Sequence, residues 1–360
     1  MLLILKAKLQ PCEEQRRSLL KTMERFNAAC NYISKAAFSS KTYNKVKLQR
    51  RLYYDIRKKY GLSAQLAIRA ISKVVESYKV ERNTLHEFDE HGAIVYDQRI
   101  LSFVGLDKVS LNTVDGRLII PMLIGAYAKL DERRIKGQAD LIYVKGEFYL
   151  CIVVDVPEES PITPEGYLGV DLGVVNIATT SDGVRYTGEA CDKTRTKYCR
   201  LKAGLQSTWT KSAKRRLRII SGRERRFKTS INHKISKEIV QAAKGTKRAI
   251  VLEDLTYIRS RTTVRHEQRE RYSKWAFDQL RSFIEYKAKI AGVLVELIDG
   301  RNTSRQCSEC GYIDKSNRHG QVFKCLACGH EENADLNAAK NIRQRAAVNR
   351  PIAVCPATGS

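Results

Sequence analysis

Four cysteines near the C-terminus have the spacing of a metal site. Cys307 and Cys310 form one C-x-x-C pair, and after fourteen further residues Cys325 and Cys328 form a second pair. Four thiolates in two such knuckles satisfy tetrahedral Zn²⁺ without a further ligand, so the pattern predicts one closed, structural zinc site. A redox-active dithiol pair is the alternative interpretation.

Asp171 is the first of three acidic residues whose positions suggest catalysis. In "LGVDLGV" a period-two alternation puts Gly169, Asp171 and Gly173 on one face of a predicted strand, with Asp171 in the middle. We expect open space above this glycine-flanked carboxylate, suited to a hydrated metal ion and a phosphate. An exposed strand aspartate is the alternative, although aspartate is disfavoured in strands.

Glu253 and Asp335 are the other two acidic residues whose positions suggest catalysis. Glu253 ends the apolar run "AIVLEDL", and a strand buried on both faces accepts a carboxylate only if it is paired or binds a metal. Its neighbour Asp254 points the other way and is the less certain ligand; a strand end that reaches solvent is the alternative for Glu253. Asp335 follows Asn333, a good N-cap, so ordinary helix-start chemistry explains it locally.

Together, the three acids predict a two-metal nuclease. Two Mg²⁺ ions roughly 4 Å apart need carboxylates that converge from separate elements, here two strands and the start of a helix. This layout is similar to that of RNase H-like nucleases. Paired glycosidase acids would not need so basic a chain, and the sequence has no Ser-His-Asp signature or P-loop.

The surrounding pattern divides the chain into a mixed N-terminal half and a C-terminal α/β domain. The run "LLILKAKL" is typical of a strand, residues 12–83 show helical apolar periodicity, and residues 86–157 consist of short strands with hairpin turns. A closed antiparallel barrel of about six or seven strands would bury them. After a Pro- and Glu-rich linker, strands followed by helices indicate an α/β layer domain over residues 166–350.

The charge of the chain indicates a polyanionic partner. It carries 65 Lys and Arg against 39 Asp and Glu, a net charge of +26. Residues 193–248 hold 19 of these cations against 2 Glu, which is too one-sided for a helix face that is merely solvated. A membrane surface is the competing polyanion, but no stretch approaches the roughly 20 apolar residues of a spanning helix. Nucleic acid is therefore the favoured partner.

The motifs resemble those of the TnpB family, transposon-encoded RNA-guided DNA endonucleases related to type V CRISPR effector nucleases. The resemblance is carried by "LGVDLGVVNIAT", "IVLEDL" and "TSRQCSECGY…CLACGHEENADLNAAKNI", in this order, and covers roughly residues 166–345. It implies that Asp171, Glu253 and Asp335 are the RuvC catalytic triad, which binds magnesium. The four cysteines become the zinc site of an insertion that binds the target nucleic acid.

The resemblance also implies a multidomain α+β fold. A wedge β-barrel (1–10 and 84–157) carries an inserted helical recognition domain (11–83), and a linker (158–165) leads to an RNase H-like RuvC domain (166–303 and 331–350). A zinc ribbon (304–330) interrupts the RuvC domain, and a tail (351–360) closes the chain. By analogy the candidate DNA contacts of the recognition domain are Tyr43, Lys47, Gln65 and Lys73, although they fit ordinary helix-surface residues equally well.

The function implied is double-strand DNA cleavage directed by a transposon-derived guide RNA and a target-adjacent motif. Base pairing with the guide would supply the specificity, one protein chain would bind each guide RNA, and the arginine-rich connector 256–274 could act as a lid. A cytoplasmic, nucleoid-associated prokaryotic protein is expected. The alternatives are a transposase that performs strand transfer, a non-cleaving nucleic-acid-binding regulator, and an RNA-binding protein that uses no guide.

Overall fold

The computed structural model describes residues 1–125, 135–254 and 277–348, which fall into two compact units, Met1–Pro157 and Glu158–Ser360. The predicted lid at 256–274 and the tail at 351–360 lie outside the described residues. Among the helices that are described, none is both long and apolar enough to cross a membrane.

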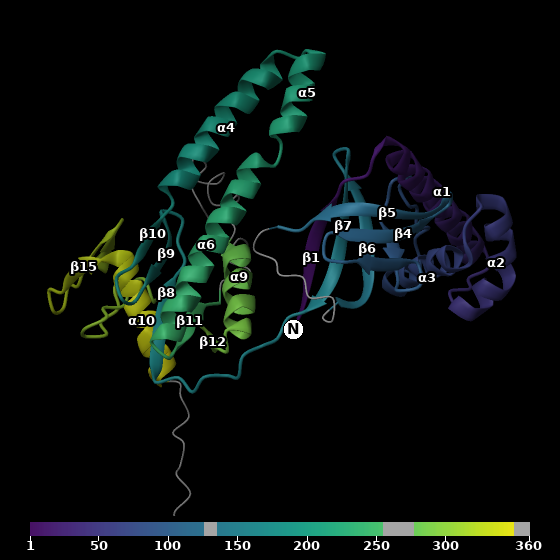
Figure 1. The fold of residues 1–360 in the computed structure, drawn as a ribbon. Coiled ribbons are helices and arrows are strands. Elements are labelled where there is room, and N and C mark those ends of the chain that lie inside the picture. The colour runs from purple at the N-terminus through teal and green to yellow at the C-terminus, as the bar shows by residue number, and fades with distance from the viewer. Residues whose placement is uncertain (126–134, 255–276, 349–360) are drawn as a thin grey trace, which may run out of the picture. The chain divides into compact units, whose positions relative to one another are not determined.

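The first unit combines a seven-stranded antiparallel sheet with three helices (Figure 1). The strand order is β2-β6-β7-β1-β5-β4-β3. Within the described residues the edge strands β2 and β3 do not pair with each other, so the sheet approaches the predicted barrel without closing. The strands are β1 (Leu2–Leu9), β2 (Ile94–Tyr96), β3 (Leu101–Val104), β4 (Lys108–Thr113), β5 (Gly116–Leu123), β6 (Ile135–Val144) and β7 (Glu147–Asp155).

The helices follow β1 directly, at the place where the apolar periodicity predicts them. They are α1 (Glu13–Ser39), α2 (Lys45–Tyr60) and α3 (Ala64–Val80). Their apolar faces join the sheet in one continuous core that includes Phe26, Tyr78 and Phe148. The helices are therefore stabilised by burial against the sheet rather than as a separate bundle.

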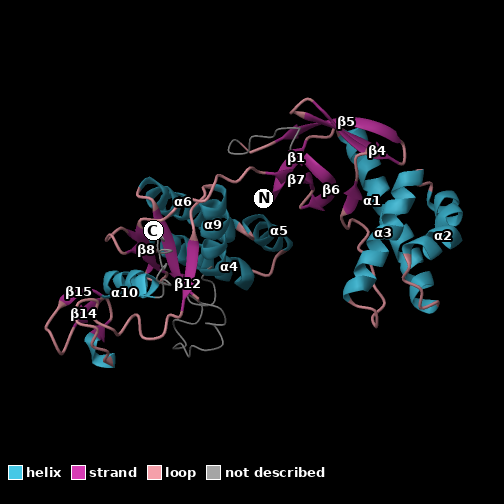
Figure 2. Cartoon of the chain, turned by 90° about the horizontal axis from the view of Figure 1, so that it is seen from below, coloured by secondary structure: helices cyan, strands magenta, loops and turns pink. Residues whose placement is uncertain are grey.

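The second unit is a five-stranded mixed sheet with helices on both faces, as expected for an α/β layer domain (Figure 2). The order is β10-β9-β8-β11-β12, in which β8, β11 and β12 run parallel to one another, and β9 pairs antiparallel with both β8 and β10. The strands are β8 (Gly166–Asp171), β9 (Asn176–Thr180), β10 (Arg185–Thr187), β11 (Arg248–Glu253) and β12 (Val295–Ile298).

Alternation along β11 places helices on both sides of the sheet. Ile250 and Leu252 pack in the core beneath α6 (Arg223–Gly245) and α9 (Phe277–Ile290), whereas Val251 packs against Ile342 of α10 (Ala334–Val348). Two further helices, α4 (Glu189–Ser207) and α5 (Lys211–Ile220), form a hairpin that extends away from the sheet in Figure 1. Hence α10 alone occupies its face of the sheet among the described helices, and its first turn lies where it can reach the strand ends.

A small cysteine-rich module precedes α10. It contains a 3-10 turn (Lys315–Asn317) and a three-stranded sheet of β13 (Arg318–His319), β14 (Val322–Lys324) and β15 (Glu331–Asn333). Phe323 packs with Cys307, Cys325 and Ala334 in a core of its own.

Candidate nuclease site

Asp171 and Glu253 end two neighbouring parallel strands. Asp171 is the last residue of β8 and Glu253 the last of β11, and the register pairs Val170 with Leu252. Because the carboxyl ends of parallel strands meet at one edge of a sheet, both carboxylates lie at that edge. The sequence placed Asp171 in mid-strand, and this detail is wrong: the strand ends at Asp171, and Gly173 lies beyond it.

Asp335 reaches the same edge from the first turn of α10. The amide oxygen of Asn333 accepts hydrogen bonds from the backbone N–H groups of Asp335 (3.2 Å) and Leu336 (3.3 Å), which confirms Asn333 as the N-cap. Only 6% of Asp335 is exposed. Its Oδ2 accepts a bond from the Asn176 amide at 2.8 Å and its Oδ1 one from the Arg318 guanidinium at 2.8 Å.

The glycine beside Asp171 does not leave open space, contrary to the expectation from the sequence. A Cβ on Gly169 would lie 2.7 Å from the backbone nitrogen of Arg343 and closer still to the carbonyl oxygen of Ala339. Gly169 is therefore required because α10 crosses β8 at backbone contact distance. This close crossing brings Asp335 to Asp171.

The electrostatics of the three acids favour a bound cation. Enclosure by the protein raises the pKa of Asp171 well above its ordinary value, and the charges of Glu253 and Asp335 raise it further, whereas Arg318 lowers it. Burial likewise raises the pKa of Glu253, against the effects of the Thr303 hydroxyl and nearby arginines. Carboxylates that destabilise one another in this way gain most from a shared metal ion, and hard oxygen ligands suit Mg²⁺.

Glu253 is held by a turn that sequence reasoning missed. The Thr303 hydroxyl donates a hydrogen bond to the Glu253 carboxylate. Gly300 leaves room for that carboxylate, because a Cβ there would lie 2.8 Å from its carbon. The Asn341 amide of α10 in turn donates to the Thr303 carbonyl oxygen at 2.8 Å. One helix thus positions both Asp335 and, through Thr303, Glu253.

The four predicted cysteines come together. Their sulfur atoms all lie within 4.8 Å of one another, with Cys307 and Cys328 3.7 Å apart and Cys310 and Cys325 3.5 Å apart. Four thiolates around one Zn²⁺ at a Zn–S distance of about 2.3 Å would be separated by about 3.8 Å, so the cluster fits such an ion. Although burial acts to raise it, the backbone N–H groups of Cys328 and Ala327 lower the pKa of Cys325 to about 7, whereas the pKa values of the other three thiols are raised in the metal-free cluster. Cys325 is therefore the thiol that most readily supplies the thiolate that metal binding needs.

The cysteine-rich module also places Arg318 beside the three acids. Arg318 opens β13, and its guanidinium forms an ion pair with Asp335 at 2.8 Å. A guanidinium in this position can bind a phosphate oxygen next to carboxylate-bound metal. No local pattern in the sequence points to Arg318, because it lies 17 residues from its partner in a different element.

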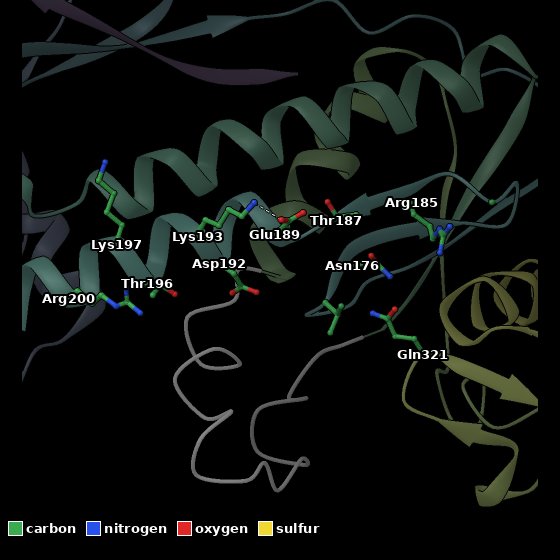
Figure 3. Close-up of a pocket in the computed structure, with 12 residues that line it drawn as sticks. Asn176, Arg185, Thr187, Glu189, Asp192, Lys193, Thr196, Lys197, Arg200 and Gln321 are labelled. Carbon is green, nitrogen blue, oxygen red and sulfur yellow. Dashed lines mark ion pairs between the residues drawn. The ribbon is translucent and has the colours of Figure 1, made fainter.

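A cleft with charges of both signs lies along α4 (Figure 3). Its cations outnumber the acids Glu189 and Asp192, and Lys193 pairs with Glu189 at 2.5 Å. The cleft encloses about 1310 Å³ and does not include the three acids themselves, but Asn176, which binds the Asp335 carboxylate, lies at one end. Lys193, Lys197 and Arg200 project along the wall that α4 forms. A polyanionic strand in this cleft would have its phosphates beside cations and would reach the carboxylates through Asn176.

The four candidate DNA contacts lie in the first unit, apart from the acids in sequence and unit: Tyr43, Lys47, Gln65 and Lys73. The Lys73 ammonium donates to the Asn27 amide oxygen at 2.9 Å and to the Ala93 carbonyl at 2.7 Å, so it is engaged within the protein. Lys47 is exposed at the start of α2.

The other two candidates are also engaged within the unit. The Tyr43 hydroxyl donates to the Arg82 carbonyl at 3.2 Å, and the Gln65 amide donates to the Asp97 carboxylate. A role of these residues in DNA binding stays a prediction, and Lys47 is the one whose side chain is most accessible.

Comparisons with known proteins find similar sequences over the part of the chain that holds the cysteine module and Asp335. Residues 277–342, which include the cysteine module and Asp335, match a family model described as "Cas12f1-like, TNB domain". A Cas12f1 endodeoxyribonuclease of Sulfoacidibacillus thermotolerans is 46% identical over 119 residues, which cover 32% of this chain and 26% of that protein. A TnpB-like protein of Methanocaldococcus jannaschii is 38% identical over 124 residues, covering 34% and 44%.

Longer matches extend the likeness to most of the chain. InsQ of Escherichia coli K12, described as a putative RNA-guided DNA endonuclease, is 26% identical over 259 residues, covering 65% of this chain and 63% of InsQ. In these three relatives the matched part is 26% to 63% of their own length. A Cas12f1 solved by cryo-EM in complex with sgRNA and target DNA shares the fold, with a TM-score of 0.60 at 16% identity over 91% of this chain and 83% of that one. The comparisons thus agree with the resemblance that the motifs indicate: the chain is similar to TnpB-like proteins and to Cas12f endonucleases.

Proposed function

We propose that this protein is an RNA-guided DNA endonuclease that hydrolyses phosphodiester bonds at Asp171, Glu253 and Asp335. The observation that carries the proposal is their convergence: two adjacent strand ends and one helix start bring three carboxylates to a single sheet edge. Packing alone does not require acids with raised pKa values at this edge, and such groups gather where chemistry is done.

The residues of the site would have different roles in hydrolysis. The three carboxylates would hold Mg²⁺, in our proposal two ions, which when bound supply an activated water and stabilise the leaving 3′ oxygen. Arg318 is placed to bind the scissile phosphate, and Asn176 orients the Asp335 carboxylate through its Oδ2. Thr303 fixes the orientation of Glu253, so that its carboxylate is preorganised before the strand arrives.

The partners follow from the relatives and from the charge. Relatives are named RNA-guided or CRISPR-associated DNA endonucleases, and one solved neighbour is a complex with sgRNA and target DNA. With a net charge of +26, this chain is equipped to bind both polyanions. We propose a guide RNA and double-stranded DNA bearing an adjacent motif as partners, a structural zinc in the cysteine cluster, and a location in the cytoplasm of a prokaryote.

The first unit would then serve as wedge and recognition parts, and the cysteine module would bind the target strand. Strand transfer by a transposase uses the same acids and is the nearest rival. A regulator that binds without cutting explains the charge and the cysteines, but not Glu253 at the end of a buried strand with a raised pKa.

The decisive experiment is expression of the chain together with the DNA that flanks its gene. The RNA that copurifies is sequenced, and a plasmid library with randomised target flanks is tested for cleavage with Mg²⁺. We expect a discrete RNA, a depleted flanking motif and linear product. A second reaction with labelled donor DNA separates hydrolysis from strand transfer, which would join the ends instead.

Two neighbouring carboxylates supply the matched control. Glu253→Gln should abolish cutting and leave RNA binding intact, whereas Asp254→Asn should cut normally, because Asp254 is exposed and pairs with Arg281 at 2.9 Å rather than with the site. Equal products from Glu253→Gln and the unaltered protein would refute the proposal.

A further inference from the structure

The tip of the α4–α5 hairpin exposes a tryptophan that the packing of the domain does not use. Trp209 lies in the turn between the two helices, and 78% of it is exposed. Its backbone φ is +50°, a left-handed conformation that is rare for a bulky side chain. A large exposed aromatic residue on a strained turn is costly to maintain, so it calls for an explanation outside the free fold.

The hairpin itself is scarcely packed. Of the 19 residues of α4 only Cys191 is buried, and of α5 only Ala213 and Ile220 are. A helix that is polar on almost every side is stabilised by something other than a core of its own. The hairpin projects from the sheet in Figure 1, so its tip is presented by the rest of its unit rather than covered by it.

The charge around Trp209 identifies the partner. Residues 193–223 contain eleven Lys and Arg and no acidic residue. The Lys214 ammonium lies 5.7 Å from the centre of the Trp209 ring, and Lys211, Arg215 and Arg216 are exposed on the same short helix. An aromatic platform bordered by cations is the arrangement that binds single-stranded nucleic acid, in which bases stack on the ring and phosphates contact the cations.

We propose that Trp209 is a stacking platform for an unpaired base of a nucleic-acid strand bound along the α4–α5 hairpin. The inference deepens the proposed function and rests on it for the identity of the strand, which is either the guide RNA or the unwound DNA. The alternative partner is a protein, either a second copy of this chain or another protein. Its surface would have to present acidic side chains to these cations and an apolar pocket to the Trp209 ring.

Intrinsic fluorescence tests the inference directly. The chain has two tryptophans, so Trp275→Phe leaves Trp209 as the sole emitter. This variant is titrated with a single-stranded RNA, a single-stranded DNA and a blunt duplex of equal length, each labelled so that anisotropy reports total binding. We expect saturable quenching with a single strand, stronger for whichever of RNA or DNA is the source, and little quenching with the duplex.

Substitution then separates stacking from charge. Since one stacked base contributes about 1–3 kcal/mol, Trp209→Ala should weaken single-strand binding by roughly 5- to 150-fold, and Trp209→Tyr should retain most of the affinity. Ile219→Ala is the matched control, because Ile219 is half exposed on the same hairpin and should leave affinity unchanged. Melting curves of the variants verify that they fold.

Three results would overturn the inference. The first is Trp209 emission that does not change while anisotropy shows that the strand is bound to saturation. The second is equal single-strand affinity of Trp209→Ala and the parent, and the third is quenching that depends on protein concentration and not on the added strand. The outcome is independent of cleavage. A parent protein whose Trp209 is quenched by single strands but which cuts no target plasmid would refute the endonuclease and keep the platform. A parent that cuts target plasmid, together with equal single-strand affinity of Trp209→Ala, would do the reverse.

Discussion

Substitution of Gly169 by alanine tests whether the close crossing of α10 over β8 positions Asp335, one of the three proposed catalytic acids. The added Cβ would lie 2.7 Å from the backbone nitrogen of Arg343, where ordinary contact begins at 3.4 Å, so α10 must move by about 0.7 Å or more. The obstacle is backbone, which no rotamer change can relieve. The 2.8 Å bonds that Asp335 accepts from Asn176 and Arg318 would then be stretched or broken.

Two magnitudes follow from this displacement. Overpacking of this kind costs about 1–3 kcal/mol, which for a unit of this size lowers the melting temperature by roughly 2–12 °C. A catalytic group displaced by nearly 1 Å can lose up to about 100-fold in rate. We therefore expect Gly169→Ala to fold, to bind RNA and to cleave plasmid about 10- to 100-fold more slowly than the parent.

Gly204→Ala is the control for this experiment. Gly204 lies in α4, and no atom lies within 4 Å of the position that an added methyl group would take. Alanine there should raise stability by up to about 1 kcal/mol and leave the cleavage rate unchanged. Calorimetry and a single-turnover cleavage assay are run on both variants. If Gly169→Ala melts and cleaves like the parent, α10 does not determine the position of Asp335 and the reasoning fails.

Three further predictions follow from the site. Asp171→Asn should stabilise the protein against urea at pH 8 in buffer without added magnesium, because it removes a carboxylate whose pKa the fold raises. Each unit of that shift corresponds to about 1.4 kcal/mol, and the gain should vanish as the pH falls below the ordinary carboxyl pKa of about 4, where Asp171 is protonated in the folded and the unfolded protein alike. Thr303→Val should lose the hydrogen bond to the charged Glu253 carboxylate, which is worth about 1.5–3 kcal/mol. The cleavage rate should fall roughly 10- to 100-fold, and the magnesium concentration that gives half-maximal rate should rise. Thr303→Ser should restore both the rate and the magnesium dependence. Cys325→Ser should reduce the zinc content, measured by mass spectrometry, from one equivalent per chain to well below one, and the cleavage rate should fall with the zinc content. A full zinc content in this variant would show that the four thiolates are not the zinc ligands.

The sequence predicted those parts of the site that have local signals. The buried strand ending in Glu253, the Asn333 cap before Asp335 and the paired cysteines each show in a few consecutive residues, and the structure contains all of them. The partners of the acids were missed for a physical reason. Asn176 lies 159 residues from Asp335, and Thr303 lies 50 from Glu253, so no periodicity links them.

The interpretation of the glycines beside Asp171 was wrong for a related reason. Alternation correctly places Gly169 on the face of Asp171, but it cannot say what covers that face. A glycine is compatible both with open space for a ligand and with a backbone at contact distance, and only the position of α10 decides between them. Likewise, seven strands were within the predicted number, but the pairing of the edges depends on curvature that short apolar runs do not encode.

The ion pair between Arg318 and Asp335 connects the cysteine module to the proposed nuclease site. Arg318 belongs to β13, which lies between the two cysteine pairs, whereas Asp335 is in the first turn of the helix that follows β15 of the same module. Asp335 is thus held from two sides by one small module, and Arg318 also lowers the pKa values of Asp171 and Glu253, which keeps both closer to the charged form that binds metal. Metal in the cysteine cluster would therefore affect the nuclease site without contacting it. By ordering the module, the metal would fix the Arg318 guanidinium, whose positive charge offsets the mutual repulsion of the three acids. A zinc site that only stiffened a binding loop would not need to place an arginine there.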